Sequence, residues 1–162
     1  MNNLEPSNQT KLYGLEKYFD ELVRMYNQNI YPNKILISGQ KGIGKSTMAY
    51  HFINYVLTIS ENNRYNIKDY SIDVDSPEFK KIMNKSNTNL ITIDVNPDKK
   101  MIDINQIREL IINFNKSSFN EKPRFVLIDN IELLNINSIN ALLKILEEPN
   151  DNIFFILINN NK

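Results

Sequence analysis

Apolar residues recur along the chain with two different periods. Between Leu15 and Tyr26 they fall three and four positions apart, which is the spacing of one face of an amphipathic helix. Short continuous apolar runs occur in four other places, KILIS (34–38), NLITIDV (89–95), FVLID (125–129) and IFFILI (153–158). Runs of this length and composition are typical of buried strands.

Further helices are predicted between these strands, over 45–59, 76–84, 103–114 and 139–146. Ser76 is a suitable N-cap, with Pro77 at the first helical position. Asp103 followed by Gln106 has the spacing of a capping box. The stretch 60–75 is polar and is expected to be an irregular surface excursion. Strands that alternate with helices favour an α/β fold with a mostly parallel sheet, covered by helices on both faces.

Composition narrows the classes of function. The chain has 162 residues and a formal net charge of zero, so no strong overall field draws it to nucleic acid or to an anionic membrane. It has no cysteine, which excludes disulfides and cysteine-ligated zinc, and its one histidine, His51, is interpreted as a packing residue. The N-terminus lacks the features of a signal peptide and no apolar run is long enough to span a bilayer, so a cytoplasmic location is expected.

The stretch GQKGIGKS, residues 39–46, fits the pattern G-x-x-x-x-G-K-[ST] and lies between a predicted strand and a predicted helix. In this context the glycines let backbone N–H groups turn around a phosphate, and the helix N-terminus favours the negative charge. Lys45 would reach the β- and γ-phosphates of ATP, and Ser46 would ligate Mg²⁺. The expected nucleotide-binding residues of this loop are Gly39, Gln40, Lys41, Gly42, Ile43, Gly44, Lys45, Ser46 and Thr47.

A second feature of the site is Asp129, at the end of the apolar run 125–128. It is the natural partner of the loop and would hold Mg²⁺ through water. In many ATP-hydrolysing proteins a water-activating glutamate comes next, but here the next residue is Asn130, which can orient a water but not take its proton. Glu132 can replace the base only if the turn directs it back into the site. Loss of a positioned base costs about 10²–10⁴ in rate, so binding with weak or absent turnover is expected.

The stretch VLIDNIELLNINSINALLKILEEP (126–149) resembles the signature of bacterial clamp-loader AAA+ subunits, in which NALLK-x-LEEPP follows the Walker B strand. Two branches of that family compete. The motor branch (gamma/tau) usually has a glutamate after the Walker B aspartate and a four-cysteine zinc module. This chain has Asn130 and no cysteine, and NLITIDVNPDKKMIDINQIREL (89–110) also resembles the delta prime branch of DNA polymerase III. The delta prime branch is therefore favoured.

The resemblance implies a AAA+ P-loop core in three layers, with five parallel strands in the order 5-1-4-3-2. The four apolar runs would be strands 1 to 4, and the fifth strand and the helical lid would follow residue 162. Residues 1–162 are therefore expected to be a AAA+ nucleotide-binding domain that is truncated at its C-terminal side. Leu12 and Tyr13 would cover the adenine, and Asn159 or Asn160 would take the sensor position at a strand end. An alternative reading makes Leu12 and Tyr13 core residues, and the asparagines loop residues.

The implied function is that of a clamp-loader subunit, which binds ATP and Mg²⁺ weakly or idly and helps to load the sliding clamp onto primed DNA. Its implied partners are the other subunits (gamma/tau and delta), the clamp and the DNA. One alternative is an active gamma/tau-like motor that uses Glu132 or a partner as the base. A remote alternative is a small P-loop kinase, but such kinases need clustered arginines and the four arginines here are scattered: Arg24, Arg64, Arg108 and Arg124.

Overall fold

The computed structural model describes residues 4–59, 65–96, 98–114, 120–147 and 152–161. The chain forms two compact units. One unit, called the sheet unit here, comprises residues 33–40 and 88–162, and the other, the helical unit, comprises residues 1–32 and 41–87. No helix in the described part of the chain is long and apolar enough to cross a membrane.

The sheet unit is built on four parallel strands, each of which corresponds to one apolar run of the sequence. They are β1 (Lys34–Ser38), β4 (Leu90–Ile93), β5 (Arg124–Ile128) and β6 (Ile153–Asn159). Their order is β1-β6-β5-β4, so the predicted parallel α/β architecture and the implied order of strands 1 to 4 are confirmed. The most buried strands are β5 and β6 in the middle of this sheet, whereas β1 and β4 lie at its edges.

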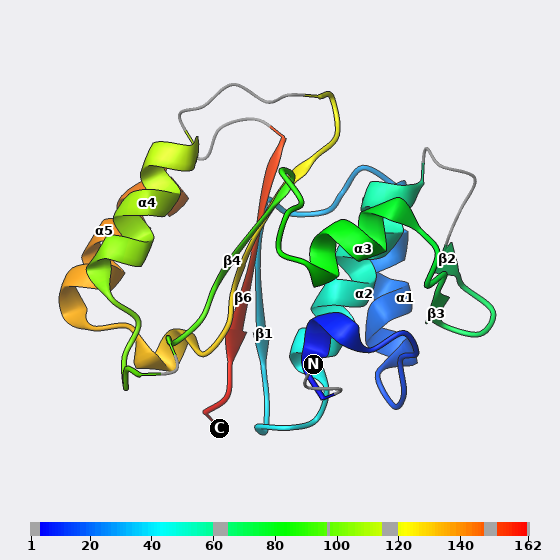
Figure 1. Cartoon of the computed structure of the whole chain (residues 1–162), viewed down its shortest axis with the longest axis horizontal. Coiled ribbons are helices and arrows are strands. Elements are labelled where there is room, and N and C mark those ends of the chain that lie inside the picture. The colour runs from blue at the N-terminus through cyan, green and yellow to red at the C-terminus, as the bar shows by residue number, and fades with distance from the viewer. Residues whose placement is uncertain (1–3, 60–64, 97, 115–119, 148–151, 162) are drawn as a thin grey trace. The chain divides into compact units, whose positions relative to one another are not determined.

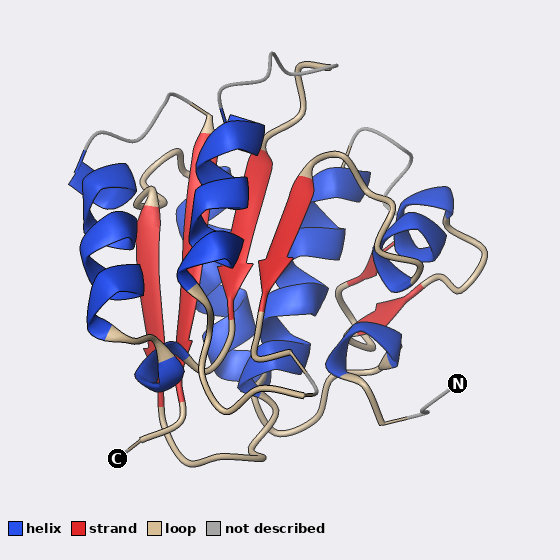
Figure 2. Ribbon diagram, turned by 60° about the vertical axis from the view of Figure 1, so that its left-hand side comes forward, coloured by secondary structure: helices blue, strands red, loops and turns tan. Residues whose placement is uncertain are grey.

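Two helices, α4 (Ile104–Phe114) and α5 (Ile136–Glu147), lie side by side and cover one face of this sheet (Figure 1; Figure 2). The core beneath them joins Ile107 and Leu110 of α4 and Leu142 of α5 to Val126 and Phe155 of the strands. The predicted capping box begins α4, since Asn105 N–H donates to Asp103 Oδ1 and Asp103 N–H donates to Gln106 Oε1, both over 2.9 Å. The short 3-10 helix η2 (Ile131–Leu133) connects β5 with α5.

The helical unit is organised around α2 (Lys45–Thr58), which is buried along almost its whole length. Around it lie the 3-10 helix η1 (Pro6–Asn8), α1 (Glu16–Asn27) and α3 (Pro77–Met83). Phe19 of α1, with no exposed surface, stacks on Tyr65 at 5.0 Å between ring centroids and meets the edge of Tyr55 at 6.2 Å. The predicted cap of α3 is also present, because Phe79 N–H donates to Ser76 Oγ over 3.5 Å.

The prediction of an irregular excursion over 60–75 was wrong in part. Residues 60–64 lie outside the described residues, but beyond them β2 (Tyr65–Asn66) and β3 (Ser71–Ile72) form a small antiparallel ladder. Strands of two residues are too short to show an alternating pattern in the sequence. These strands are held by packing against residues that are distant in the sequence, since both Tyr65 and Ile72 are buried. The ladder thus depends on tertiary contacts rather than on local propensity.

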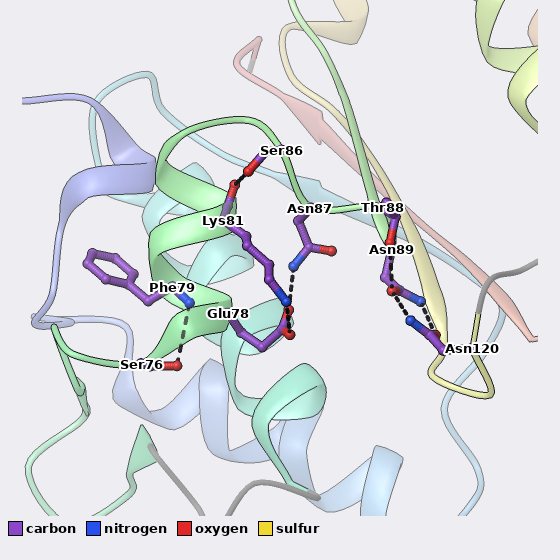
Figure 3. Close-up of polar contacts among 9 residues, drawn as sticks. All are labelled: Ser76, Glu78, Phe79, Lys81, Ser86, Asn87, Thr88, Asn89 and Asn120. Atoms are coloured by element: carbon purple, nitrogen blue, oxygen red, sulfur yellow. Dashed lines mark hydrogen bonds and ion pairs between the residues drawn. The ribbon is translucent and has the colours of Figure 1, made fainter.

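Polar side chains fix the ends of α3 and β4 (Figure 3). In the helical unit the buried carboxylate of Glu78 accepts from Asn87 Nδ2 over 2.6 Å and from Lys81 Nζ over 3.0 Å. In the sheet unit Asn89 and Asn120 exchange two amide hydrogen bonds of 2.9 Å each. The second pair attaches the start of β4 to the loop that leads into β5.

Candidate functional site

The glycine-containing loop connects β1 with α2, as its sequence predicts. Gly39 N–H donates to the carbonyl oxygen of Asn159 over 3.3 Å, so the start of the loop is attached to the end of β6 within the sheet unit. Gly42 and Gly44 have φ of +84° and +93°, in the left-handed region that favours glycine. The two glycines therefore supply the left-handed backbone conformations through which the chain turns from β1 into α2.

The helix that follows this loop presents the motif residues at its first turn. Lys45 is the first residue of α2 and is only 4% exposed, and Ser46 and Thr47 are half-buried. Gly44 N-caps the helix without a side-chain hydrogen bond, and Met48 N–H donates to the Gly44 carbonyl over 2.9 Å. The positive end of the α2 dipole and the ammonium of Lys45 thus occur within one turn, an arrangement suited to an anion. The remaining loop residues, Gln40, Lys41, Gly42 and Ile43, are exposed.

The segment expected on the adenine side belongs to the same unit as residues 41–46 of the loop. Leu12 is buried, with 2% of its surface exposed, and its N–H donates to the Tyr70 carbonyl oxygen over 3.0 Å. Tyr13 is 72% exposed, and Lys11 Nζ lies 5.8 Å from the centre of its ring. Of these two, Leu12 contributes to the core of the helical unit, whereas Tyr13 presents an exposed ring that a ligand could contact.

His51 lies on α2, two turns after the loop, and is completely buried. Its Nε2 is 3.1 Å from the Gln9 carbonyl oxygen and its Nδ1 is 2.9 Å from Tyr65 Oη. Because a carbonyl oxygen only accepts, Nε2 carries the proton and Nδ1 accepts from the tyrosine hydroxyl. Burial lowers the pKa of His51 to about 4, against the opposing effect of the Gln9 carbonyl. The interpretation of His51 as a packing residue is confirmed.

In the sheet unit, polar side chains converge where β4, β5 and β6 end. Asp129 Oδ1 accepts from Asn130 N–H over 2.8 Å and from Asn160 Nδ2 over 3.4 Å. Asn130 has φ of +54° and ψ of +48°, a left-handed conformation that asparagine tolerates better than most residues. Its amide donates to Asp94 Oδ1 over 2.7 Å and accepts from Asn160 Nδ2 over 2.8 Å. Asp94 joins this cluster although the sequence analysis did not single it out.

The structure distinguishes the two asparagines that were candidates for the sensor position. The side chain of Asn159 accepts from Asn161 N–H over 3.0 Å and so caps its own turn. Asn160, in contrast, directs its side chain to Asp129 and Asn130. Glu132 lies on η2 and its Oε2 accepts from Asn160 N–H over 3.2 Å. The turn after β5 therefore does direct Glu132 back to the end of β6.

Each of the two units carries an oxygen-bearing side chain that Mg²⁺ could use as a ligand. Mg²⁺ is usually held by one or two protein oxygens, with water and phosphate oxygens completing the octahedron. The Ser46 hydroxyl and the Asp129 carboxylate are donors of that kind. Among the described residues no group of three or more His, Cys, Asp or Glu side chains could hold a metal ion by itself. Each unit by itself therefore supplies one oxygen donor of the kind that Mg²⁺ takes.

The comparison with protein families identifies the relatives of this chain. A family model described as DNA polymerase III, delta subunit, matches residues 14–162, which is most of the chain. The chain belongs to this family. The predicted resemblance to DNA polymerase III subunits is thereby confirmed.

Individual DNA polymerase III subunits are also similar to this chain, at modest sequence identity. The delta' subunit from Buchnera aphidicola subsp. Baizongia pistaciae is 30% identical over 151 residues, which cover 85% of this chain and 43% of the relative. The delta' subunit from Buchnera aphidicola subsp. Schizaphis graminum is 25% identical and covers 91% and 43%. The gamma/tau subunit from Mycoplasma genitalium is 28% identical and covers 93% and 24%. This chain therefore spans less than half the length of these relatives.

Solved structures of similar proteins include a DNA polymerase III gamma subunit-related protein from Thermotoga maritima. That comparison has a TM-score of 0.48 and 18% identity, and covers 87% of this chain and 38% of the other. The structure of PCH-2 from C. elegans has a TM-score of 0.48 and 17% identity, and covers 99% and 42%.

Proposed function

We propose that this chain is the nucleotide-binding module of a delta prime-like clamp-loader subunit, which binds Mg²⁺–ATP and turns it over slowly or not at all. The observation that carries the proposal is the hydrogen bonding of the Asn130 side chain. Its amide is engaged on both sides, by Asp94 and by Asn160, so it is held as a structural link and supplies no base. The phosphate-binding loop in front of α2 and the family membership support the binding half of the proposal.

In this proposal the loop residues 39–47 hold the phosphates. Lys45 neutralises the β- and γ-phosphates, and Ser46 and Asp129 hold Mg²⁺, which screens the phosphate charge when it is bound. Tyr13 lies on the adenine side, and Asn160 rather than Asn159 presents its side chain to Asp129. The proposed partners are other DNA polymerase III subunits of the gamma/tau and delta types and, through the assembly, the sliding clamp and primed DNA.

A second candidate function is an active gamma/tau-like ATPase. One observation favours it, namely that Glu132 is directed to the end of β6, where its carboxylate accepts from Asn160 N–H. In that arrangement Glu132 would act as the general base in place of Asn130. The two candidates differ in one measurable property, which is the release of phosphate.

Nucleotide binding and turnover should separate in this protein. We expect a fluorescent ATP analogue to bind in a saturable, Mg²⁺-dependent way and phosphate release to stay at the buffer level. Lys45→Ala should weaken binding by at least about tenfold, or 1.4 kcal/mol, because it removes the cation at the first turn of α2. Lys17→Ala is the matched control, since it removes an exposed lysine on α1 outside the loop. Fluorescence titration and a phosphate-release assay measure the two quantities.

Two results would contradict the proposal in different ways. Phosphate release that is well above the buffer level and is lost in both Lys45→Ala and Glu132→Gln would favour the active motor. Absence of saturable binding in the unmodified protein would reject the nucleotide-binding role. The assembly role is tested separately by co-expression with tagged gamma/tau and delta subunits, with which the protein is expected to co-purify.

A further inference from the structure

The ends of three neighbouring strands are connected by a chain of side-chain hydrogen bonds. Asn160, after β6, donates from Nδ2 to Asn130 Oδ1 over 2.8 Å. Asn130, after β5, donates from Nδ2 to Asp94 Oδ1 over 2.7 Å. Asp94 follows β4 directly. The order of these three residues therefore repeats the order of the strands, β6-β5-β4.

The direction of this chain is set by Asp94. An ionised carboxylate can only accept hydrogen bonds, so the NH₂ of Asn130 must face Asp94 and its oxygen must face Asn160. Asp94 is itself held in place, because Oδ1 also accepts from Val95 N–H over 2.6 Å and its carbonyl accepts from Gln106 Nε2 over 2.8 Å. The carboxylate is exposed to solvent, yet its position is fixed from two sides.

We infer that Asp94 and Asn130 form a carboxylate–amide pair across the ends of two neighbouring strands, in which the end of β4 supplies the carboxylate and the end of β5 supplies the amide. In this pair Asn130 is a positioning residue that fixes the Asp94 carboxylate at the carboxyl end of the sheet. A carboxylate at position 130 would face that of Asp94 at hydrogen-bond distance. The inference deepens the proposed function, on which its link to nucleotide turnover rests, but the pair itself is a property of the folded sheet unit.

The pair predicts the effect of a glutamate at position 130. Glutamate at position 130 would remove the donor to Asp94 and place two like charges together, and such charges cannot both stay ionised without cost. Asn130→Glu alone would therefore destabilise the protein instead of creating a useful base. If Asp94 becomes asparagine at the same time, the pair is restored with its two roles interchanged, because the new amide can donate to the new carboxylate.

The test is a double-mutant cycle on the stability of the protein, with a control for backbone strain. Glutamate and glutamine both tolerate φ of +54° less well than asparagine does, so Asn130→Glu is compared with Asn130→Gln, which has the same length and no charge. Both substitutions are made in the unmodified and the Asp94→Asn backgrounds. At pH 7.5 we expect the Glu variant to unfold about tenfold more readily than the Gln variant when Asp94 is present, a difference in Tm of roughly 3–6 °C.

In the Asp94→Asn background the Glu and Gln variants should melt within about 1 °C of each other. Asp98→Asn is the charge-matched control, because it removes an exposed carboxylate of the same loop and should leave the deficit of Asn130→Glu unchanged.

The inference would be overturned if Asn130→Glu melted below Asn130→Gln by the same amount in the unmodified and the Asp94→Asn backgrounds. It would also be overturned if the two variants melted alike when Asp94 is present. These melts require no nucleotide, so they decide the pair even if the nucleotide-binding role fails. Under the proposed function, the Asp94→Asn and Asn130→Glu double variant is also the one in which a carboxylate at position 130 no longer faces the carboxylate of Asp94. Phosphate release should therefore be compared in the double variant and not in Asn130→Glu alone.

Discussion

Acidification from pH 7.5 to pH 4 is expected to remove about 3 kcal/mol from the free energy of unfolding through His51 alone. The pKa of His51 is about 4 in the folded protein and about 6.5 in an unfolded chain. Between these values the unfolded state binds a proton that the folded state does not. The stability contributed by His51 is therefore fully present above pH 6.5 and is lost as the pH falls towards 4.

The measurement compares the unmodified protein with His51→Gln by urea unfolding at several pH values. Glutamine keeps a donor for the Gln9 carbonyl but does not titrate, and the carboxylates that also titrate in this range are common to both proteins. The variant should be less stable at pH 7.5, and its disadvantage should shrink by about 3 kcal/mol at pH 4. If the stability of the two proteins changed with pH in parallel, burial would not lower the pKa of this histidine.

Phe155→Ala is expected to lower the free energy of unfolding by about 3–5 kcal/mol. Phe155 has no exposed surface and lies in the middle of β6, in the core beneath α4 and α5. Its replacement removes apolar contacts and leaves a cavity that the paired strands on both sides cannot close. Because β6 pairs with both β1 and β5, this loss affects the centre of the sheet.

The neighbouring phenylalanine provides the control for this prediction. Phe154 points to the other side of β6 and is only half-buried, with its ring 5.6 Å from that of Phe125. Phe154→Ala should therefore cost no more than about half as much as Phe155→Ala. Guanidinium unfolding followed by circular dichroism measures both. Equal losses would mean that the assignment of faces on β6 is wrong.

Much of this fold could be predicted from the sequence because local signals agreed with each other. The four apolar runs became four parallel strands, and the caps at Ser76 and Asp103 formed as their spacing predicts. The position of the glycine-containing loop between a strand and a helix could also be predicted, since its glycines, its lysine and its flanking elements all lie close together in the sequence. Such features depend on contacts between residues that are near one another along the chain, and periodicity and motif spacing report these directly.

Other features were decided only by tertiary structure, because they join residues that are distant along the chain. Asp94 gave no signal in the sequence, and it entered the site because β4 pairs with β5 and brings it to Asn130, 36 residues away. The choice between Asn159 and Asn160 depended on which side chain the end of β6 turns towards Asp129. On α5 the apolar pattern did not tell Leu142, which is buried, from Leu143, which is 48% exposed. Helical periodicity predicts an apolar stripe, but the sheet against which the helix packs decides which part of that stripe is covered.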